Sequence, residues 1–575
     1  SRQKSSYASA KIDDELPFVP NEFEDIEKCT MPRIRKKWLN GWTDGCHGLI
    51  HELELGQLIR GEENLPKFAP DNKTKLKKLK TRIVFTVKPN GRHKVRITAS
   101  AWRMVSGVEY TYTSTPSVTA ENIIDAVAVH RGLFCGSIDV KQAFITTKRS
   151  KEHYHDTALL LPKNFFVNGK PVGPDVWVLL EKYVYGEDFA SKMFVSDIAL
   201  MLEGLDCHRS NVYPSIFIRP DTHEEGALLT ALQIDDFKVY YEKVKAFHRI
   251  IKALNKTKRQ CIFNSGEIGT YNGVRYTENV DETTGGRFID KDINEWVQQW
   301  ISGIENIYKC VIPYQNSTLP SNISIQIAEA EKCAMADVDL DFVAVMQRIA
   351  GGCQWLVRKG MWLHIFIGVH FQARFCLQPT VFHLKMAFHL LGYIKRSLLW
   401  NIRCRYRSAQ ITGVLRPKLQ IQTDASFMTA GKKGSILALM ITWNGSLIIA
   451  QTITMKRIAR SVAEAEWSAY AAGLQKGHGA GMFLLELGDP EPYPFGVLSD
   501  SEATMIVVET NKGTKKMKHM ELDIYSTQRS MEQNLHKHFH VSGDDLAVDI
   551  LTKHTNTAKK TETLLKSIPG LVGNF

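Results

Sequence analysis

The chain has 575 residues, of which 44% are hydrophobic and 23% are charged. This composition is typical of a globular protein, excludes a fibrous or wholly disordered chain, and at this length predicts about three or four domains. Lysine and arginine number 73 against 61 acidic residues, so the formal net charge is +12. Such an excess favours a polyanionic partner, although ribosome-bound and membrane-surface proteins share it. The ten cysteines form no CxxC pair, which indicates reduced thiols in a cytosolic or nuclear setting.

Neither a signal peptide nor a membrane span is expected. Residues 1–30 are polar and acidic, with no apolar core. The most apolar stretch, residues 360–375, is interrupted by His364, His370 and Arg374 and is too short to cross a bilayer, so we expect a buried helix. Because the sequence begins with Ser1, we interpret it as a piece of a longer chain.

The first half of the chain mixes helices and strands. Residues 36–61 have the apolar spacing of a helix. Residues 83–100 alternate as two strands around Asn90–Gly91, which is a strong hairpin signal. A helix, a buried strand and a second helix are then expected at residues 120–132, 133–140 and 192–205. The sequence LQIDDFKVYY (232–241) predicts a hydrophobic hairpin with an acidic tip.

The second half changes character twice. Beyond residue 290 the pattern is helical, at residues 293–308, 342–357 and 380–397. From residue 417 it predicts a strand at 418–427, a hairpin at 434–455 that turns at Asn444–Gly445, an Ala-rich helix at 461–477, and a strand and helix at 495–511. Strands followed by helices describe a small α/β layer domain.

Asp235 and Asp236 lie side by side at the hairpin tip, where like charges repel. An ordinary turn is one interpretation, because Asp suits turns. A metal site is the other, because a divalent cation converts that repulsion into binding. Asp139 ends the buried strand at 133–140. Three carboxylates at strand ends could converge on two divalent cations, which is the arrangement for in-line phosphoryl transfer.

Four further acids come from separate elements of the C-terminal region. Asp424 ends one strand, Glu466 lies on the Ala-rich helix, Asp500 ends another strand, and Asp549 lies near the end of the fold. Four such acids suit two metals that cleave a phosphodiester with water. Taken singly, each acid is also explained as a helix cap or a solvated residue.

Sequence blocks in a fixed order resemble the reverse transcriptase–RNase H region of copia-type (Pseudoviridae) LTR retrotransposon Pol polyproteins, from about residue 30 to about residue 560. The polymerase blocks are TRIVFTVKPNGRHKVRITAS, SIDVKQAF, LLLPKNFF and LQIDDFKVYY. The linking helices are FVAVMQRIAGGCQWLV and LQPTVFHLKMAFHLLGYIKRS, and the nuclease blocks are DASF, SVAEAEWSAY, LSDSEAT, KKMKHMELDIY and VDILTK.

The resemblance implies roles in the polymerase half. The acids Asp139, Asp235 and Asp236 would bind two Mg²⁺ ions, with Mn²⁺ as an alternative. Lys94 and Arg96 would hold the incoming dNTP, although the residues alone also fit an exposed strand face.

Two more substrate contacts follow from the same block. Phe144 would be the steric gate under the sugar, and Gln142 would be a neighbouring substrate-binding residue. Without the resemblance, Phe144 would be taken for a core aromatic.

In the nuclease half, the resemblance implies that Asp424, Glu466, Asp500 and Asp549 are catalytic metal ligands, again for two Mg²⁺ ions. Glu466 is preferred to its neighbour Glu464 because EWSAY resembles the E-x-x-A of that fold. The residues Lys518 and His519 would face the nucleic-acid backbone; otherwise they belong to a solvated basic helix.

Some positions depart from the family pattern. Gln233 stands where a tyrosine is usual, so an aromatic contact near the primer end is lost. In the segment 183–194, Asp188, Phe189 and Phe194 replace a basic residue, a glutamine and a tryptophan. These departures put fidelity or processivity in doubt.

The sequence LHKHFHV (535–541) places His536, His538 and His540 on one face of a strand. Three ligands on one strand fit a tetrahedral zinc site poorly, so we expect a wet strand face instead. His540 could alternatively help product leave the nuclease site.

The expected fold is α/β (α+β), with a right-hand polymerase, a connection and a C-terminal RNase H-like domain. The expected divisions are an N-terminal segment (1–30), fingers and palm (31–288), thumb (289–360), connection (361–416) and RNase H (417–575). The expected function is RNA-directed DNA synthesis with ribonuclease H activity.

Expected partners are an RNA template, a DNA primer strand, the RNA/DNA hybrid and dNTPs, with a homodimer or an integrase or capsid partner also open, and no membrane. The expected location is the cytoplasm, within a virus-like particle, with the nucleus as an addition. A host-adopted copy that binds nucleic acid without polymerising, or a structural subunit of a particle, remains an alternative.

Overall fold

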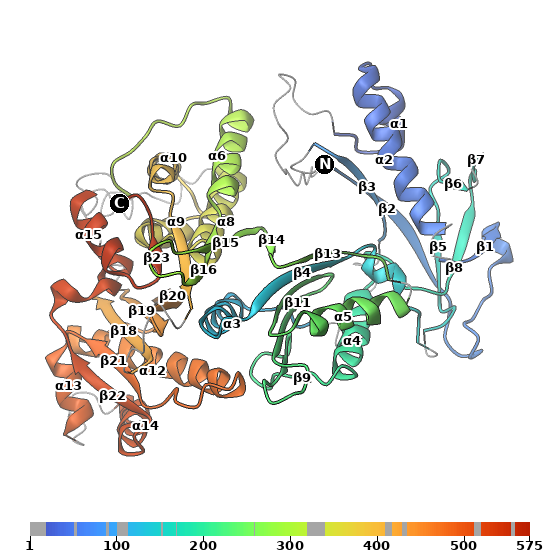
Figure 1. Cartoon of the computed structure of the whole chain (residues 1–575). Helices are drawn as coiled ribbons and strands as arrows, with labels where there is room; N and C mark the ends of the chain where they lie inside the picture. The colour runs from blue at the N-terminus through green and yellow to red at the C-terminus, as the bar shows by residue number, and fades with distance from the viewer. Residues whose placement is uncertain are drawn as a thin grey trace.

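The computed structural model describes most of the chain, and its elements form several sheets arranged side by side (Figure 1). The described residues are 19–50, 55–87, 91–100, 113–150, 153–167, 170–257, 259–318, 340–408, 417–427, 434–510, 519–553 and 558–575. Among these residues, no helix is both long enough and apolar enough to cross a membrane.

The N-terminal part is a five-stranded sheet of order β1-β8-β5-β2-β3 with helices beside it. Its strands are β1 (Gly56–Arg60), β2 (Lys77–Val87), β3 (His93–Ala99), β5 (Thr157–Leu160) and β8 (Val176–Leu180), and β6 (Phe166–Val167) pairs with β7 (Lys170–Pro171) separately. The helices are α1 (Phe23–Glu27) and α2 (Pro32–Ile50). The hairpin expected at 83–100 is confirmed by the pairing of β2 with β3, while Asn90 lies outside the described residues.

The helix expected over residues 36–61 is only partly right. The helix α2 ends at Ile50, and residues 56–60 form the strand β1 along β8. In α2, a Cβ at Gly41 or Gly45 would lie 2.8 or 3.0 Å from a carbonyl oxygen of β3, so both glycines allow the helix to approach the strand closely.

A six-stranded sheet follows, in the order β13-β4-β12-β11-β10-β9; we call it the central sheet. Its strands are β4 (Phe134–Val140), β9 (His208–Arg209), β10 (Ile216–Arg219), β11 (Leu228–Gln233), β12 (Asp236–Tyr241) and β13 (Cys261–Ser265). Apolar side chains of α4 (Ala190–Glu203) and α5 (Val244–Lys256) share a core with one face. The helix α3 (Val118–His130) packs on the other face, so the strand and helices expected in this part are confirmed.

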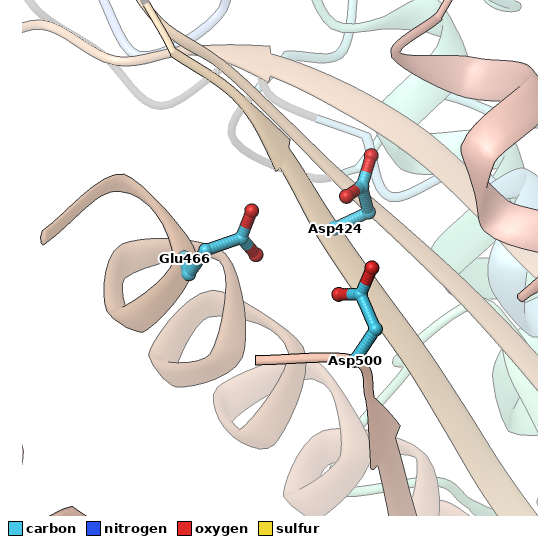
Figure 2. Close-up of side chains that lie close together, drawn as sticks. All are labelled: Asp424, Glu466 and Asp500. Carbon is cyan, nitrogen blue, oxygen red and sulfur yellow. The ribbon is translucent and has the colours of Figure 1, made fainter. Parts of the chain in front are cut away.

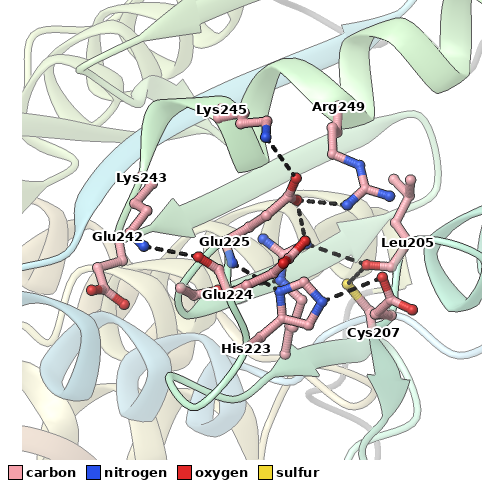
Figure 3. Close-up of polar contacts among 12 residues, drawn as sticks. Leu205, Cys207, His223, Glu224, Glu225, Glu242, Lys243, Lys245 and Arg249 are labelled. Atoms are coloured by element: carbon pink, nitrogen blue, oxygen red, sulfur yellow. Dashed lines mark hydrogen bonds and ion pairs between the residues drawn. The ribbon is translucent and has the colours of Figure 1, made fainter.

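Ion pairs fix the loop between β10 and β11 at the far end of this sheet from the acidic hairpin. The buried Glu225 contacts Arg219 at 3.4 Å and Arg249 of α5 at 2.6 Å, and Lys245 lies 3.6 Å from its other oxygen (Figure 3). Lys243 donates to the carbonyl of Glu224. Because a buried carboxylate needs such partners, this cluster holds the loop between β10 and β11 against α5.

The middle of the chain forms a third sheet, in the order β14-β15-β16-β17-β23, with several helices above it. The strands are β14 (Gly269–Tyr271), β15 (Val274–Val280), β16 (Arg287–Asp292), β17 (Arg403–Arg407) and β23 (Leu571–Val572), and the helices are α6 (Asn294–Tyr308), α8 (Val343–Lys359), α9 (Phe366–Ala373) and α10 (Val381–Ser397). The buried helix expected at 360–375 is confirmed as a short 3₁₀ turn and α9. The expected boundary at 288/289 falls inside β16, and the last strand returns to β17.

The C-terminal sheet has the order β20-β19-β18-β21-β22. Its strands are β18 (Leu419–Ser426), β19 (Ile436–Trp443), β20 (Ser446–Thr454), β21 (Phe495–Ser499) and β22 (His536–His540). Strands β18, β19 and β20 are antiparallel neighbours, whereas β21 runs parallel to both β18 and β22. The helices are α12 (Val462–Glu486), α13 (Glu502–Glu509), α14 (Glu521–Glu532) and α15 (Ala558–Ser567). This mixed α/β architecture agrees with the predicted fold class.

The helix α3 joins the central sheet to the C-terminal sheet (Figure 1). The buried Asn122 donates its side-chain amide to the carbonyl of Ile448 in β20 at 3.0 Å. Arg131, just beyond the helix, donates to the carbonyl of Leu487 at 2.8 Å. One hydrophobic core runs through these contacts, so the two halves of the chain pack directly on each other.

Two candidate carboxylate sites

The first site lies where β4 and β12 run side by side in the central sheet. Asp139 and Asp236 are direct partners across these antiparallel strands. Asp235 occupies the turn between β11 and β12, and its carbonyl accepts a hydrogen bond from the N–H of Val140 at 2.8 Å. The preceding turn residue, Ile234, has φ of +58°, which is strained for a β-branched side chain. The structure therefore brings the three acids into one region, and the turn that carries Asp235 stores backbone strain.

Burial and mutual repulsion raise the pKa values of two of these acids. The pKa of Asp236 rises to about 7, chiefly by burial, with Asp139 and Asp235 adding to the rise and the backbone N–H of Asn272 opposing it. The pKa of Asp235 is also raised, chiefly by burial and then by Asp139. Such crowding of acids is costly without a cation, and it is a physical mark of a functional site.

Two basic residues of β3 act electrostatically on the same site. Lys94 and Arg96 both lower the pKa of Asp235, which places their charges within electrostatic reach of the turn. Since β3 belongs to the N-terminal sheet, the site lies between two sheets. The basic side chains expected from the sequence thus lie near enough to Asp235 to influence its charge.

Phe144 and Gln142 lie on the short segment after β4. Phe144 is half-buried, and its ring packs on Tyr185 at 4.8 Å and on Phe194 at 6.1 Å. Burial, Asp235 and Asp139 together raise the pKa of Tyr185 to about 12, so this aromatic pair adjoins the acids. Gln142 has a left-handed φ of +51° and directly precedes the 3₁₀ turn that carries Phe144.

The segment that departs from the family pattern is firmly packed. The carboxylate of Glu187 accepts from Arg149 at 2.6 Å and from the N–H of Val184 at 2.8 Å. At Gly186, φ is +89° and a Cβ would lie 2.1 Å from the carbonyl oxygen of Ala99, so only glycine fits. These contacts fix Tyr185 beside the acids.

The positions that differ from the family have identifiable environments. Phe194 is fully buried and packs against Phe144, so it serves as a core residue. Phe189 packs on His153 at 5.3 Å, and Asp188 is half-buried. Gln233 is the cross-strand partner of Asp236, and its side-chain oxygen is buried without a hydrogen-bond partner.

The second site lies at the C-terminal sheet and brings three acids together (Figure 2). Asp424 comes from β18, Glu466 from α12, and Asp500 follows β21. One carboxylate oxygen of each lies within 4.8 Å of the others, and among the described residues no other group of three His, Cys, Asp or Glu side chains is as close. Asp424 lies inside its strand rather than at its end, which corrects the sequence expectation in detail only.

Repulsion within this trio is strong. Burial and the charges of Asp424 and Asp500 raise the pKa of Glu466 to about 8. The Oε2 atom of Glu466 is buried without a hydrogen-bond partner. A buried carboxylate oxygen without a partner is rare, and a hard divalent cation would satisfy it.

Asp549 adjoins the trio without belonging to the tight group. Burial, with Asp424 and Asp500 adding to it, raises the pKa of Asp549 to about 6, although Lys553 opposes the rise. The Nζ atom of Lys553 lies 2.7 Å from Asp549 and 3.7 Å from Asp424, and the hydroxyl of Thr552 donates to Asp424. Lys553 thus supplies one positive charge among these acids, a role that the sequence analysis missed.

The choice between Glu464 and Glu466 is decided by position on α12. The carboxylate of Glu464 is bound by His519 at 2.9 Å and by the N–H of Arg460 at 2.9 Å, away from the trio. His519, expected to face the nucleic-acid backbone, is therefore tied to this glutamate. Lys518 lies outside the described residues.

The histidine strand is only partly the wet face that was expected. His536 is 1% exposed, and its Nδ1 pairs with the hydroxyl of Ser530, so the expectation is wrong for this residue. His538 is half-buried against Tyr470, whereas His540 is exposed. Burial lowers the pKa of His536 and of His538 to about 4. No zinc-like group forms here among the described residues.

A model of a known protein family matches the region that holds the first site. Residues 69–315, a little under half of the chain, match the family model described as "Reverse transcriptase (RNA-dependent DNA polymerase)". This segment contains Asp139, Asp235 and Asp236. A search of curated proteins finds no match.

Solved structures are similar to the chain at low identity. The foamy viral protease–reverse transcriptase in complex with dsDNA is 12% identical, with a TM-score of 0.41, over 90% of this chain and 96% of that chain. LC11-RNase H1 in complex with an RNA/DNA hybrid is 17% identical, with a TM-score of 0.19, over 25% of this chain and 99% of that chain. RNase H1 from Halobacterium salinarum is 12% identical, with a TM-score of 0.16, over 23% of this chain and 89% of that chain.

Proposed function

We propose that this chain is the reverse transcriptase–RNase H region of a copia-type LTR retrotransposon polyprotein. It would copy RNA into DNA at the first site and degrade the RNA strand of the hybrid at the second. The observation that supports this proposal best is the pairing of Asp139 with Asp236 across β4 and β12, beside Asp235, within the segment that matches the reverse transcriptase family.

The donor atoms of both sites fit a divalent cation, Mg²⁺ or alternatively Mn²⁺. Carboxylate oxygens are the ligands that such hard ions prefer. In the second site, Glu466 and Asp549 each carry a buried oxygen without a hydrogen-bond partner. When bound, a pair of ions in each site supplies Lewis-acid chemistry for phosphoryl transfer.

In polymerisation, Asp139, Asp235 and Asp236 would hold the metal ions. Lys94 and Arg96 bind the triphosphate from the facing strand β3, since their charges already reach Asp235. Phe144, backed by Tyr185, lies beside the acids and excludes a ribose hydroxyl by its volume, with Gln142 next to it. The fixed turn of β11 and β12 keeps this geometry preorganised.

In RNA cleavage, Asp424, Glu466 and Asp500 are the primary ligands, and Asp549 completes the set. Lys553 balances the charge of Asp424 and Asp549 when metal is absent. Glu464 and His519 position the N-terminal turns of α12 and do not act on metal directly.

The proposal extends to organisation and partners. The fingers and palm would comprise residues 31–288, followed by the thumb, connection and RNase H. Because a boundary at 288/289 divides β16, a palm that ends before Arg287 would keep that strand in one domain. The partners would be RNA template, DNA primer, hybrid and dNTPs, within a cytoplasmic virus-like particle and in the nucleus.

A primer-extension assay tests this function. The protein is mixed with an RNA template, a labelled DNA primer, dNTPs and Mg²⁺. Extension that depends on Mg²⁺ supports the proposal. If the protein binds the hybrid but does not extend the primer with either Mg²⁺ or Mn²⁺, it is instead a nucleic-acid-binding or structural relative, a reading that Gln233 and Asp188 would then explain.

A further inference from the structure

A tight turn outside the acidic hairpin reaches the first site. Asn272 and Gly273 connect β14 to β15 with φ of +47° and +74°, the two-residue turn for which Asn-Gly is favoured. The backbone N–H of Asn272 donates to Oδ2 of Asp236 at 3.4 Å. The contact is long for a hydrogen bond, but it joins this carboxylate to an element outside its own hairpin.

The side chain of Asn272 is held in turn by a buried glutamate. Its amide donates to Oε1 of Glu121 at 3.3 Å, and Oε2 of Glu121 accepts from Nζ of Lys359 at 2.7 Å. Glu121 is 0% exposed and Lys359 is 6% exposed. A continuous series of polar contacts therefore runs from α8 through α3 to a proposed catalytic acid.

Side chains alternate between the two faces of β12, and the network lies along one of these faces. Asp236, Lys238 and Tyr240 share the face of β12 that packs against α3, because side chains alternate along a strand. Lys238 is bound to Asp125 of α3, and Tyr240 donates to the same carboxylate at 3.0 Å. The polar face that begins at Asp236 thus continues into the core.

Burying these charges costs desolvation free energy, and a contribution to stability does not by itself account for their presence. Two acids, Glu121 and Asp125, are buried with three lysines, Lys238, Lys291 and Lys359. Buried ion pairs often stabilise a protein no more than apolar residues of the same volume would, so a buried pair is weak evidence for a purely structural role.

The other side of the turn rests on α8. A Cβ at Gly273 would lie 3.3 Å from the ring of Trp355, one helical turn before Lys359. The preceding residue, Tyr271, is buried, with the ammonium of Lys238 over its ring at 5.2 Å. The turn is therefore fixed between α3 and α8, with its N–H directed at Asp236.

We propose that Glu121 is a positioning residue for the polymerase site: together with Lys359 it holds the Asn272–Gly273 turn against Asp236, and thereby holds Asp236 beside Asp139 for metal binding. This inference rests on the proposed polymerase function. Groups that orient metal ligands commonly change metal affinity or activity by about 10-fold to 100-fold when removed.

Asn272→Gly is the cleanest variant. Glycine accepts the positive φ and keeps the backbone N–H, so only the link to Glu121 is lost. The matched control is Asn444→Gly, the same change in the Asn-Gly turn between β19 and β20, where φ is +46° at Asn444. Glu121→Gln is the second variant, and Asn272→Gly decides the matter if Glu121→Gln does not fold.

The experiment measures Mn²⁺ binding directly from the loss of the free-ion paramagnetic signal. All proteins carry Glu466→Gln and Asp500→Asn to remove the second site, and the same background with Asp236→Asn defines the residual binding. Asn272→Gly should weaken Mn²⁺ binding about 10-fold while hybrid affinity is unchanged. It should also speed hydrogen exchange in peptides that cover residues 269–276. Asn444→Gly should do neither.

Unchanged Mn²⁺ affinity in Asn272→Gly would overturn the inference, whether or not exchange at the turn is faster. Weaker Mn²⁺ binding together with faster exchange, and with the control unaffected, would support it. Primer extension is followed in parallel with the same proteins. A parent protein that carries only Glu466→Gln and Asp500→Asn and binds Mn²⁺, yet extends no primer, would refute the proposed polymerase function, while the Mn²⁺ comparison would still decide the role of Glu121.

Discussion

The two carboxylate sites gather acids in different ways. In the first, two adjacent strands and one strained turn bring Asp139, Asp235 and Asp236 together within about a hundred residues of sequence. In the second, Asp424, Glu466 and Asp500 come from two strands and a helix, and their oxygens lie within 4.8 Å of one another.

The difference extends to how each site balances its charge. The first site is faced by Lys94 and Arg96 from another sheet and by a backbone N–H, whereas the second has Lys553 in direct contact with its acids. When the basic side chains and the acids of a site belong to different sheets, a charged substrate can be held between the two sheets. At the second site, the basic group Lys553 lies among the acids themselves.

The largest effect is expected at the acidic hairpin. Asp235→Asn should abolish primer extension, by about three orders of magnitude or more, because a metal ligand contributes several kcal/mol to the transition state. Hybrid binding should persist because it depends on spread positive charge. Gel-shift and extension assays on one substrate measure both. Near-normal extension would return Asp235 and Asp236 to the status of an ordinary turn.

A matched pair on α12 tests the second site. Glu466→Gln should remove RNA cleavage almost entirely, whereas Glu464→Gln should reduce it by less than about tenfold, since Glu464 contacts His519 and not the trio. Cleavage of a labelled RNA strand in a hybrid is the measurement. Equal losses in both variants would mean that α12 as a whole, rather than Glu466, carries the activity.

Selection between deoxyribose and ribose tests the proposed polymerase site alone. Phe144→Val should admit ribonucleotides, raising rNTP incorporation relative to dNTP by roughly tenfold or more, because the gate acts by steric exclusion. Single-nucleotide incorporation kinetics measure the ratio. Phe144→Tyr, which keeps the ring, is the control, and discrimination that survives Phe144→Val would assign the gate elsewhere.

A smaller effect is expected from pH. The pKa of Glu466 is raised to about 8, so metal must compete with a proton below that pH. The Mg²⁺ concentration for half-maximal cleavage should fall as pH rises from 6 to 8. Without metal, the same raised pKa makes the folded protein less stable at higher pH. Above about pH 4.5 the folded state binds more protons than the unfolded state, so the free energy of unfolding falls as pH rises toward 8.

Glu466→Gln should flatten that second trend, and thermal unfolding in a chelator at pH 6 and pH 8 measures it. If the variant and the wild-type protein lose the same stability between these two values, the repulsion argued for the trio is absent.

Local pattern predicted much of the fold and of both sites. The alternation of LQIDDFKVYY and the turn signal at Asn444–Gly445 depend on neighbours in sequence, and both hairpins are present. The helix expected over 36–61 failed at residues 56–60, because pairing with β8 outweighs helical spacing there. His536 was expected to be exposed to solvent, yet it contacts Tyr470 of α12 and Ser530 of α14. These contacts depend on tertiary packing, which the local sequence pattern does not reveal.

The residues that were missed act across long sequence separations. Lys553 lies beside Asp424, and Asn272 beside Glu121 and Asp236, although more than a hundred residues separate Lys553 from Asp424 and Asn272 from Glu121. A lysine or an Asn-Gly turn looks ordinary in sequence, since lysine is common on surfaces and Asn-Gly is common in loops. Only the tertiary packing shows that Lys553 meets Asp424 and that Asn272 meets Glu121 of α3.

The central claim is that the chain carries two separate sites, and one substrate tests it. A hybrid with labels on both the DNA primer and the RNA template is given to Asp139→Asn and to Asp500→Asn, with folding checked by thermal unfolding. Each site has its own set of metal-binding acids, so each site should function without the other. We expect that Asp139→Asn cleaves RNA but does not extend the primer, and that Asp500→Asn extends the primer but does not cleave. Loss of both activities in either folded variant would contradict it.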